Sequence, residues 1–157
     1  MYWFMALSVV LAVAADQLVK LWVVKAIPLH TAVEAIPGLF HFTYVQNTGA
    51  AFSALEGQIW LFALVFAVFT AAILWEFSKK RMGFSAFERW CIVFVFAGGL
   101  GNMIDRIRLG YVVDMIAVDF MNFPVFNVAD CFITCGCIAL MVSLIFFNKK
   151  FWKDEKV

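Results

Sequence analysis

Three aspartates, Asp114, Asp119 and Asp130, stand close together in the sequence between two strongly apolar segments. The chain is 65% hydrophobic and only 15% charged, so carboxylates gathered at one point are expected to face water or to perform chemistry. Two carboxylates held close cannot both ionise easily, and they therefore share a proton. One can then act as a base on water while the other acts as an acid toward a carbonyl, which cleaves an amide without a covalent intermediate.

Asp130 has a competing structural explanation. Asn127 with an acid three residues later resembles a capping box, and acids are favoured at a helix N-terminus. Asp114 favours the chemical hypothesis, because Pro124 makes a helical continuation unlikely and the chain must turn back and can bring the two acids together. We therefore expect Asp114 and Asp130 to form the pair and Asp119 to lie outside it. Serine catalysis has less support, since the sequence contains no G-x-S-x-G motif.

The elements that must position these residues are four apolar runs. A hydrocarbon core of about 30 Å needs roughly 20 residues per helix, and suitable runs cover approximately 2–24, 59–77, 87–107 and 128–147. A cleaved signal peptide explains the first run poorly, because Asp16 and Lys20 interrupt it and no basic region precedes it. The predicted fold class is a mainly α membrane protein, a bundle of four transmembrane helices that forms a single domain over residues 1–157.

The basic residues predict the orientation of this bundle. One group lies between the second and third runs and another follows the fourth; they are Lys79, Lys80, Arg81 and Arg89, then Lys149, Lys150, Lys153 and Lys156. By the positive-inside rule both groups are cytoplasmic, and so are both termini. The outward loops are then 25–58 and 108–127, which places Asp114 and Asp130 near the extracytoplasmic surface. The net charge of +1, without a basic patch, gives no indication of nucleic-acid binding.

Polar residues inside the first and third runs are predicted to face into the bundle, because lipid exposure would be expensive. Asp16 and Lys20 are four apart with the acid first, the favourable helical orientation for an ion pair. Two hypotheses remain open for them, a self-neutralising pair or support for a polar site between helices. In the third run the residues at helical spacing on one face are Gly98, Asn102 and Asp105/Arg106.

The first outward loop contains a predicted strand. Phe40, Phe42 and Tyr44 alternate within Leu39–Gln46, and Asn47-Thr48-Gly49 then predicts a turn. A small sheet on the outer leaflet is the expected result. It could act as a lid over the helix ends, or it could hold an extended peptide or an acyl chain.

The four cysteines are predicted to be small packing residues. Cys91 lies in the third run, and Cys131, Cys135 and Cys137 lie in the fourth. Zinc usually needs more ligands than this group offers, and both histidines fall in a different loop. We therefore expect no metal site, no cofactor and no disulfide framework.

Five motifs resemble those of the lipoprotein signal peptidases (signal peptidase II) in order and spacing. They are Asp16-Gln17-x-x-Lys20, Asn47-x-Gly49-Ala50-Ala51-Phe52, Gly98-Gly99-x-Gly101-Asn102-x-x-Asp105-Arg106, Val112-Val113-Asp114 and Phe126-Asn127-Val128-Ala129-Asp130. The match extends from the first run to the fourth. Met115 and Cys131 stand where the family commonly has Phe and Ser.

The resemblance implies an aspartyl endopeptidase of the bacterial plasma membrane, with four transmembrane helices and an outward β-cradle. Such an enzyme removes the signal peptide from prolipoproteins just before a diacylglyceryl cysteine, works among membrane lipids and binds globomycin-type inhibitors. The resemblance places the catalytic pair on Asp114 and Asp130. The supporting and substrate-binding residues that it implies are Asp16, Lys20, Asn47, Gly49, Asn102, Arg106 and Asn127.

The rival hypothesis is a non-enzymatic membrane protein, such as a transporter subunit or a scaffold. A transporter should place its carboxylates near mid-membrane, often on broken helices. The acids of this chain cluster at one predicted surface, which favours the peptidase.

Overall fold

Four helices form the body of the protein, seen in a computed structural model that describes residues 2–49 and 57–148. They are α1 (Tyr2–Ala26), α2 (Ile59–Lys79), α3 (Ala86–Leu109) and α4 (Val128–Val142), and α4 continues into the π-helical turn η2 (Ser143–Phe147). All four are long and apolar enough to cross a membrane. The predicted spans are thus confirmed, and the protein is a multi-pass membrane protein.

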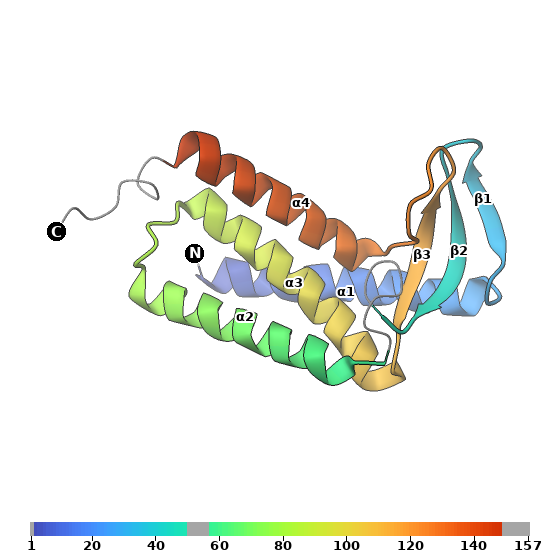
Figure 1. Cartoon of the computed structure of the whole chain (residues 1–157), viewed down its shortest axis with the longest axis horizontal. Coiled ribbons are helices and arrows are strands. Elements are labelled where there is room, and N and C mark those ends of the chain that lie inside the picture. The colour runs from blue at the N-terminus through green and yellow to red at the C-terminus, as the bar shows by residue number, and fades with distance from the viewer. Residues whose placement is uncertain (1, 50–56, 149–157) are drawn as a thin grey trace.

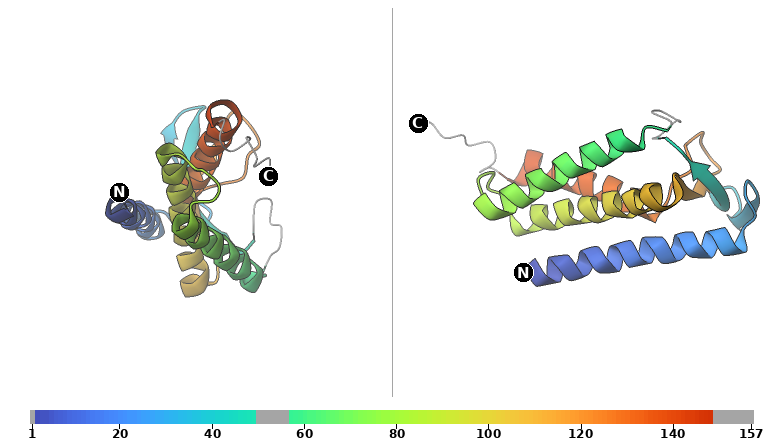
Figure 2. Two further views of the ribbon diagram at one scale, coloured as in Figure 1. Left: turned by 90° about the vertical axis from the view of Figure 1, so that its left-hand side faces the viewer. Right: turned by 90° about the horizontal axis from the view of Figure 1, so that it is seen from below.

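α3 is the central helix, in contact with α1, α2 and α4. Half of the most apolar 18-residue stretch of α3 is buried inside the protein, against 6% of that of α2. Within the described residues α2 packs mainly on α3. Small residues allow α3 and α4 to approach closely, since a Cβ on Gly136 would lie 2.8 Å from a methyl group of Val95. Figure 2 shows the bundle from its end and from below, with α2 on its outer side.

A three-stranded antiparallel sheet stands at one end of the bundle, as Figure 1 shows. Its order is β1 (Ala32–Ile36), β2 (Phe40–Asn47) and β3 (Val112–Val118). The start of α1 and the end of η2 lie at the opposite end of the bundle. The predicted strand is confirmed as β2, and the predicted turn after it is present, with the amide of Gly49 bonded to Asn47 Oδ1 at 2.9 Å.

β3 and β1 were not predicted as strands, and the segment that contains Asp114 was expected only as part of the outward loop 108–127. Four of the seven residues of β3 in succession, from Val112 to Met115, are buried. A strand buried on both faces has no alternation of apolar and polar residues, so its pattern resembles a plain apolar run. Residues 50–52 of one motif and the basic group at Lys149, Lys150, Lys153 and Lys156 lie outside the described residues.

The sheet is joined to the bundle by an apolar cluster. It consists of Val23 and Ile27 at the end of α1, Tyr44 of β2, and Val113 and Met115 of β3. Met115 is fully buried there, so the residue that departs from the common family pattern fills a place in the core. The cluster holds β3 across the end of the bundle, which determines where Asp114 lies.

Candidate active site

Asp114 is the third residue of β3, and its side chain is almost completely buried, with 3% exposed. Two neutral amides donate to its carboxylate. Asn47 Nδ2 lies 2.9 Å from one oxygen, and Asn127 Nδ2 lies 2.6 Å from the other. β3 starts close behind α3 because Gly110, with φ 84°, ends the helix in the left-handed conformation that glycine adopts readily.

Asp130 lies in the first turn of α4, and the predicted capping box is present. Asn127 N donates to Asp130 Oδ2 at 3.1 Å, and Asp130 N donates to Asn127 Oδ1 at 2.9 Å. The other carboxylate oxygen of Asp130 accepts from Asn102 Nδ2 at 2.7 Å. Capping and a place in the polar site are therefore compatible, since each uses a different oxygen.

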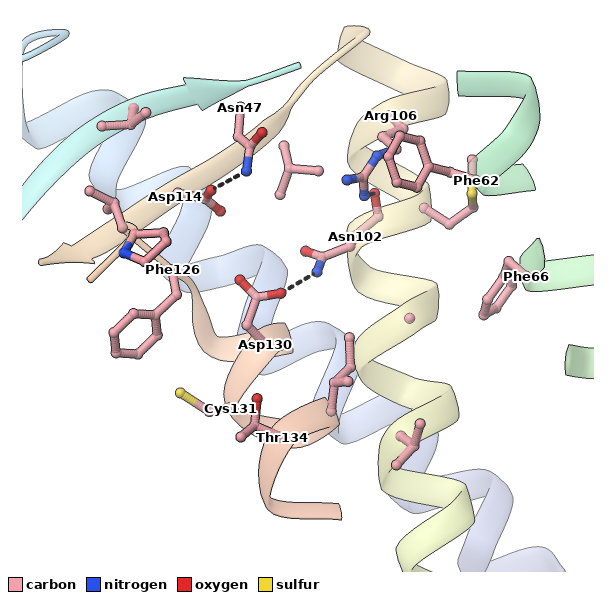
Figure 3. Close-up of a pocket in the computed structure, with 18 of the residues that line it drawn as sticks. Asn47, Phe62, Phe66, Asn102, Arg106, Asp114, Phe126, Asp130, Cys131 and Thr134 are labelled. Carbon is pink, nitrogen blue, oxygen red and sulfur yellow. Dashed lines mark hydrogen bonds between the residues drawn. The ribbon is translucent and has the colours of Figure 1, made fainter. Parts of the chain in front are cut away.

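Asn127 is the residue that joins the two acids. It is fully buried, bonds Asp114 through its side chain and bonds Asp130 through its backbone and its side-chain oxygen. Figure 3 shows Asp114 and Asp130 on facing elements, with Asn47 and Asn102 beside them.

The electrostatic environment of Asp114 favours its protonated form. Burial is the largest cause, and together with the charge of Asp130 it raises the pKa of Asp114 to about 6. Hydrogen bonds from Asn47 and Asn127 and the charge of Lys20 act in the opposite direction. A carboxyl with this pKa can hold a proton close to neutral pH, as a catalytic acid must.

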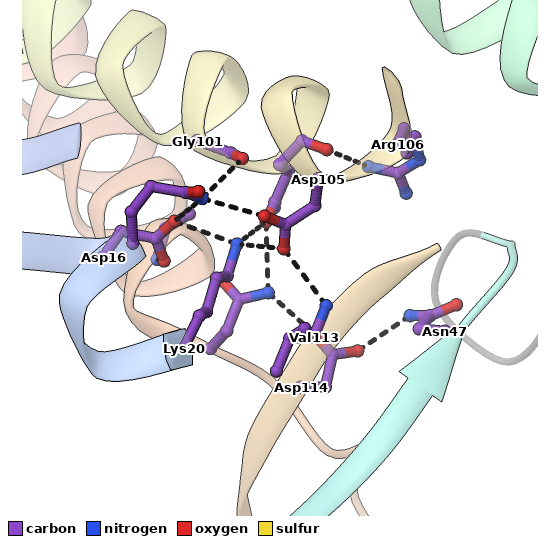
Figure 4. A network of polar contacts seen from close by, with 12 residues as sticks. Asp16, Lys20, Asn47, Gly101, Asp105, Arg106, Val113 and Asp114 are labelled. Carbon is purple, nitrogen blue, oxygen red and sulfur yellow. Dashed lines mark hydrogen bonds and ion pairs between the residues drawn. The ribbon is translucent and has the colours of Figure 1, made fainter. Parts of the chain in front are cut away.

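A buried network of ions lies behind the two acids (Figure 4). Lys20 Nζ lies 2.9 Å from Asp16 Oδ2 and 2.9 Å from Asp105 Oδ2, and it donates to Asn102 Oδ1 at 3.0 Å. The expected pair of Asp16 and Lys20 is present, but it is not a self-contained pair, because a second acid and the amide of Asn102 share the ammonium group. The network therefore connects α1 to the polar site.

Each acid of this network also holds a backbone amide of another element. Asp16 Oδ1 accepts from Ala129 N at 2.9 Å, at the start of α4, and Asp105 Oδ2 accepts from Val113 N at 3.1 Å, in β3. Asp105 was not among the predicted site residues. Its position in the Asn102-x-x-Asp105 motif was the available signal, since it is about one helical turn from Asn102, and the structure shows both residues buried.

Asp114 and Asp130 both line a cavity of about 960 Å³. Its remaining walls are largely apolar and come from the end of β2, from α2, α3 and α4, and from the segment before α4, including Phe62, Phe66 and Phe126. Arg106 also lines it, with its guanidinium 4.2 Å from the centre of the Phe62 ring and its Nη2 donating to Gly49 O at 2.8 Å. Asp105 and Arg106 were expected on one face, but they diverge, Asp105 toward Lys20 and Arg106 toward the cavity.

Asp119 lies apart from this site, as expected. It is exposed directly after β3, where its carboxylate lies 2.6 Å from Nδ1 of His41. All four cysteines are free, and only Cys91 is buried. The prediction that all of them are packing residues is wrong for Cys135, which is exposed, and both Cys131 and Cys135 line the cavity.

These features define a multi-pass membrane protein with a largely apolar cavity that two acids enter at one end of the bundle, and comparison with known proteins agrees with them. Residues 8–146 match the family model described as Signal peptidase (SPase) II. A "Lipoprotein signal peptidase" of Streptococcus agalactiae is 45% identical over 93% of this chain and 90% of its own length. One of Streptococcus pyogenes is 40% identical over 95% and 93%.

Solved structures show the same relationship. A bacterial membrane enzyme determined by the in meso method at 2.3 Å resolution aligns with a TM-score of 0.85 and 30% identity, over 97% of this chain and 93% of the other. A second, determined by the same method at 1.9 Å, aligns with a TM-score of 0.80 and 31% identity, over 92% and 94%. The chain belongs to the signal peptidase II family and is a membrane peptidase of that family.

Proposed function

We propose that this protein is an aspartic endopeptidase of the bacterial plasma membrane that removes the signal peptide from prolipoproteins. It cuts just before the cysteine that carries diacylglycerol, and Asp114 and Asp130 activate the attacking water. One observation carries this proposal: two acids from β3 and α4 converge on a single apolar cavity and are joined by one buried residue, Asn127.

The cavity suits a lipidated peptide. Its apolar walls match a signal peptide and an acyl chain, while its polar groups gather at the end next to the sheet. A substrate that lies in the membrane can therefore present one amide to the two acids and leave its apolar parts among Phe62, Phe66 and their neighbours.

In the proposed mechanism Asp114 and Asp130 share one proton, so that one is a base and the other an acid. One carboxylate removes a proton from water, and the other carboxyl donates to the carbonyl oxygen of the scissile amide. The raised pKa of Asp114, about 6, supports a proton within this pair near neutral pH. Arg106 lines the same cavity, and its guanidinium adds positive charge beside the reacting carbonyl.

The proposed orientation places the sheet and the two acids on the extracytoplasmic side. The basic residue Lys79 ends α2, and Lys80 and Arg81 follow it, at the opposite end of the bundle from β3. The positive-inside rule then assigns that end to the cytoplasm. A prolipoprotein that spans the membrane would present its cleavage site at the outer end, where the acids lie.

The test is a cleavage assay with the purified protein in detergent or lipid. A prolipoprotein with a diacylglyceryl cysteine should be cut, and a globomycin-type inhibitor should block the reaction. The matched controls are the same prolipoprotein without lipid, its Cys→Ser variant, and the Asp114→Asn enzyme, none of which should give product. Cleavage of the unlipidated substrate at the same rate would contradict the proposed specificity.

The rival hypothesis of an ion-conducting or transport subunit receives less support. The acids lie at one end of the bundle beside the sheet, and the helices that carry the polar network are continuous in the region of the site. Transporters that bind ions near mid-membrane commonly use broken helices.

A further inference from the structure

The two acids of the site accept the same number of hydrogen bonds but from different kinds of donor. Both oxygens of Asp114 face side-chain amides, those of Asn47 and Asn127. Asp130 instead accepts a backbone N–H at the N-terminus of α4 and the side-chain amide of Asn102. A helix N-terminus carries partial positive charge, which favours the ionised form of a carboxyl placed there. The two acids are therefore chemically unequal.

The amide of Asn102 can point in only one direction. Its Oδ1 accepts from Lys20 Nζ at 3.0 Å and from Asn127 Nδ2 at 3.1 Å. Both of these groups are donors, so a flipped amide would place its NH2 against an ammonium group and a second NH2. The nitrogen of Asn102 must then face Asp130, to which it donates at 2.7 Å.

Lys20 is itself held in position by its partners and by burial. It is 3% exposed and its Nζ lies 2.9 Å from both Asp16 and Asp105, so these two acids fix its side chain toward Asn102. Successive hydrogen bonds from Lys20 to Asn102 to Asp130 polarise one another in a site of low dielectric. We call these three residues the Lys20 relay.

We propose that the Lys20 relay assigns the proton of the catalytic pair: Asp130 stays ionised and is the base that activates water, and Asp114 carries the proton and is the acid. In this assignment Lys20 and Asn102 are positioning residues, which act through Asp130. The inference deepens the proposed peptidase function and rests on it. The raised pKa of Asp114, caused first by burial, is consistent with the assignment.

The steps of cleavage balance with this assignment. Asp130 takes a proton from water as the water oxygen bonds to the carbonyl carbon, and Asp114 gives its proton to the carbonyl oxygen, which yields a neutral geminal diol. Asp130 then protonates the leaving nitrogen as the C–N bond breaks. Asp114 takes a proton from one hydroxyl of the diol, so the products are a carboxylic acid and an amine and the pair returns to its first state.

The titration of the pair depends on the charges around it. Within the described residues, the charged groups that face the site are Asp16 and Lys20 on α1 and Asp105 and Arg106 on α3. α4 adds two titratable thiols, Cys131 and Cys135. β2 contributes the neutral Asn47, and α2 contributes apolar side chains. Two matched substitutions leave all of these charges in place.

The decisive experiment compares Asn102→Asp with Asn47→Asp in the pH dependence of kcat/KM. In each variant one carboxylate oxygen can still accept the hydrogen bonds that the asparagine oxygen accepts. The second oxygen, which carries negative charge, replaces the N–H group that donates to one of the two catalytic acids. Asn102→Asp should move the acid limb of the bell-shaped pH profile, where kcat/KM rises with pH, to higher pH by about one unit or more, because it acts on Asp130. Asn47→Asp should move the alkaline limb to higher pH, because it acts on Asp114. Exchange of the two limbs between these variants would overturn the assignment.

The role of Lys20 is tested by a double-mutant cycle on the acid limb. Lys20→Gln should move that limb to higher pH in the wild-type background. In the Asn102→Leu background, which has no amide for Lys20 to orient, Lys20→Gln should move the limb little further. The shifts of the two substitutions should therefore not be additive. A lysine with a merely structural role would lower thermal stability and leave the acid limb in place, and this result would remove Lys20 from the relay.

A measurement without substrate keeps the inference testable if a variant misfolds or cleavage is not observed. Infrared difference spectra of folded protein with isotope-labelled aspartate should be recorded at a pH between the two limbs, or near pH 5 if no limbs can be measured. Loss of a protonated carboxyl band in Asp114→Asn and of a carboxylate band in Asp130→Asn supports the assignment, and the reverse pattern overturns it. Absence of prolipoprotein cleavage by the wild type would contradict only the proposed function.

Discussion

At the scale of single residues, Asp130 shows that a helix cap and a reactive carboxylate can be the same side chain. One oxygen completes the capping box with Asn127, and the other receives Asn102 and faces the cavity. The sequence pattern alone could not separate the two roles, because Asn followed by an acid after three residues is typical of a cap whether or not the acid reacts. The difference lies in Asp114, which only the fold brings near.

Asparagine substitutions separate these roles. Asp114→Asn and Asp130→Asn are nearly isosteric, and Asp130→Asn keeps an oxygen that can accept from Asn127 N, so we expect both variants to fold. If the acids act as a pair, each variant should lower the prolipoprotein cleavage rate by at least about 100-fold. The double variant should be no slower than either single one, because residues that act as a unit are not additive.

Asp119→Asn is the matched control for this series. Its side chain is exposed and pairs with His41 away from the cavity, so the variant should keep most of the wild-type rate. Turnover close to wild type in Asp114→Asn or Asp130→Asn would refute the pair, and inactivity of folded Asp119→Asn would show that the wrong acids are paired.

The raised pKa of Asp114 also predicts how stability depends on pH. Because the folded-state pKa of about 6 exceeds the ordinary value of 3.8, this group stabilises the folded protein fully below about pH 4, and the contribution is lost as pH rises through 6. Asp114→Asn lacks this titration. Relative to wild type, its free energy of unfolding should therefore rise by up to about 3 kcal/mol between about pH 4 and about pH 7.5.

Thermal unfolding in detergent at the two pH values measures this difference. Asp119→Asn, measured beside it, shows how an exposed aspartate behaves under the same conditions. A stability difference between wild type and Asp114→Asn that does not change with pH would contradict a raised pKa for this carboxyl.

At the scale of elements, the helices were predictable from the sequence and the strand with the first acid was not. A span of about 20 apolar residues leaves a clear signal, whatever its neighbours are. β3 has seven residues, buried among α1, α3 and β2, and its identity as a strand depends on pairing with β2 across 67 positions of sequence. The Asp105 contact to Val113 depends on the same long-range arrangement.

The close approach between α1 and α3 at Gly101 can be tested by substitution. A Cβ on Gly101 would lie 2.7 Å from Asp16 Oδ2, so Gly101→Ala should displace the carboxylate that pairs with Lys20. Overpacking of this kind costs about 1–3 kcal/mol. We expect a lower melting temperature and a lower cleavage rate together.

Gly99→Ala is the control on the same helix. A Cβ there would meet only the ring edge of Phe66, at 3.0 Å, and this side chain belongs to the cavity wall and not to the ion network. Its effect on stability should be the smaller of the two. Equal stability of both variants would show that Asp16 can move away from α3 at little cost.

At the scale of the whole molecule, α2 is loosely packed, whereas α1, α3, α4 and β3 form a tightly connected frame. α1, α3 and α4 carry the polar network, β3 and α4 carry the two acids, and backbone amides of α4 and β3 are tied into the network. Within the described residues α2 packs mainly on α3, and it contributes chiefly aromatic and aliphatic side chains to the cavity. A frame of this kind can keep its carboxyls aligned while the lipid-facing side of the cavity admits an apolar substrate.

The orientation of the frame in the membrane is the last property to test. If the positive-inside rule holds, cysteines introduced at two exposed positions, Glu34 in β1 and Asp119 directly after β3, should react with an impermeant thiol reagent applied to intact cells. A cysteine at the exposed Lys80 should react only after the membrane is opened. Glu34 serves better than Asn47, because Asn47 is half-buried and holds Asp114. The wild-type chain, with its four native cysteines, gives the background, and labelling of position 80 from outside would place both acids in the cytoplasm, where a cleavage site on the outer side could not reach them.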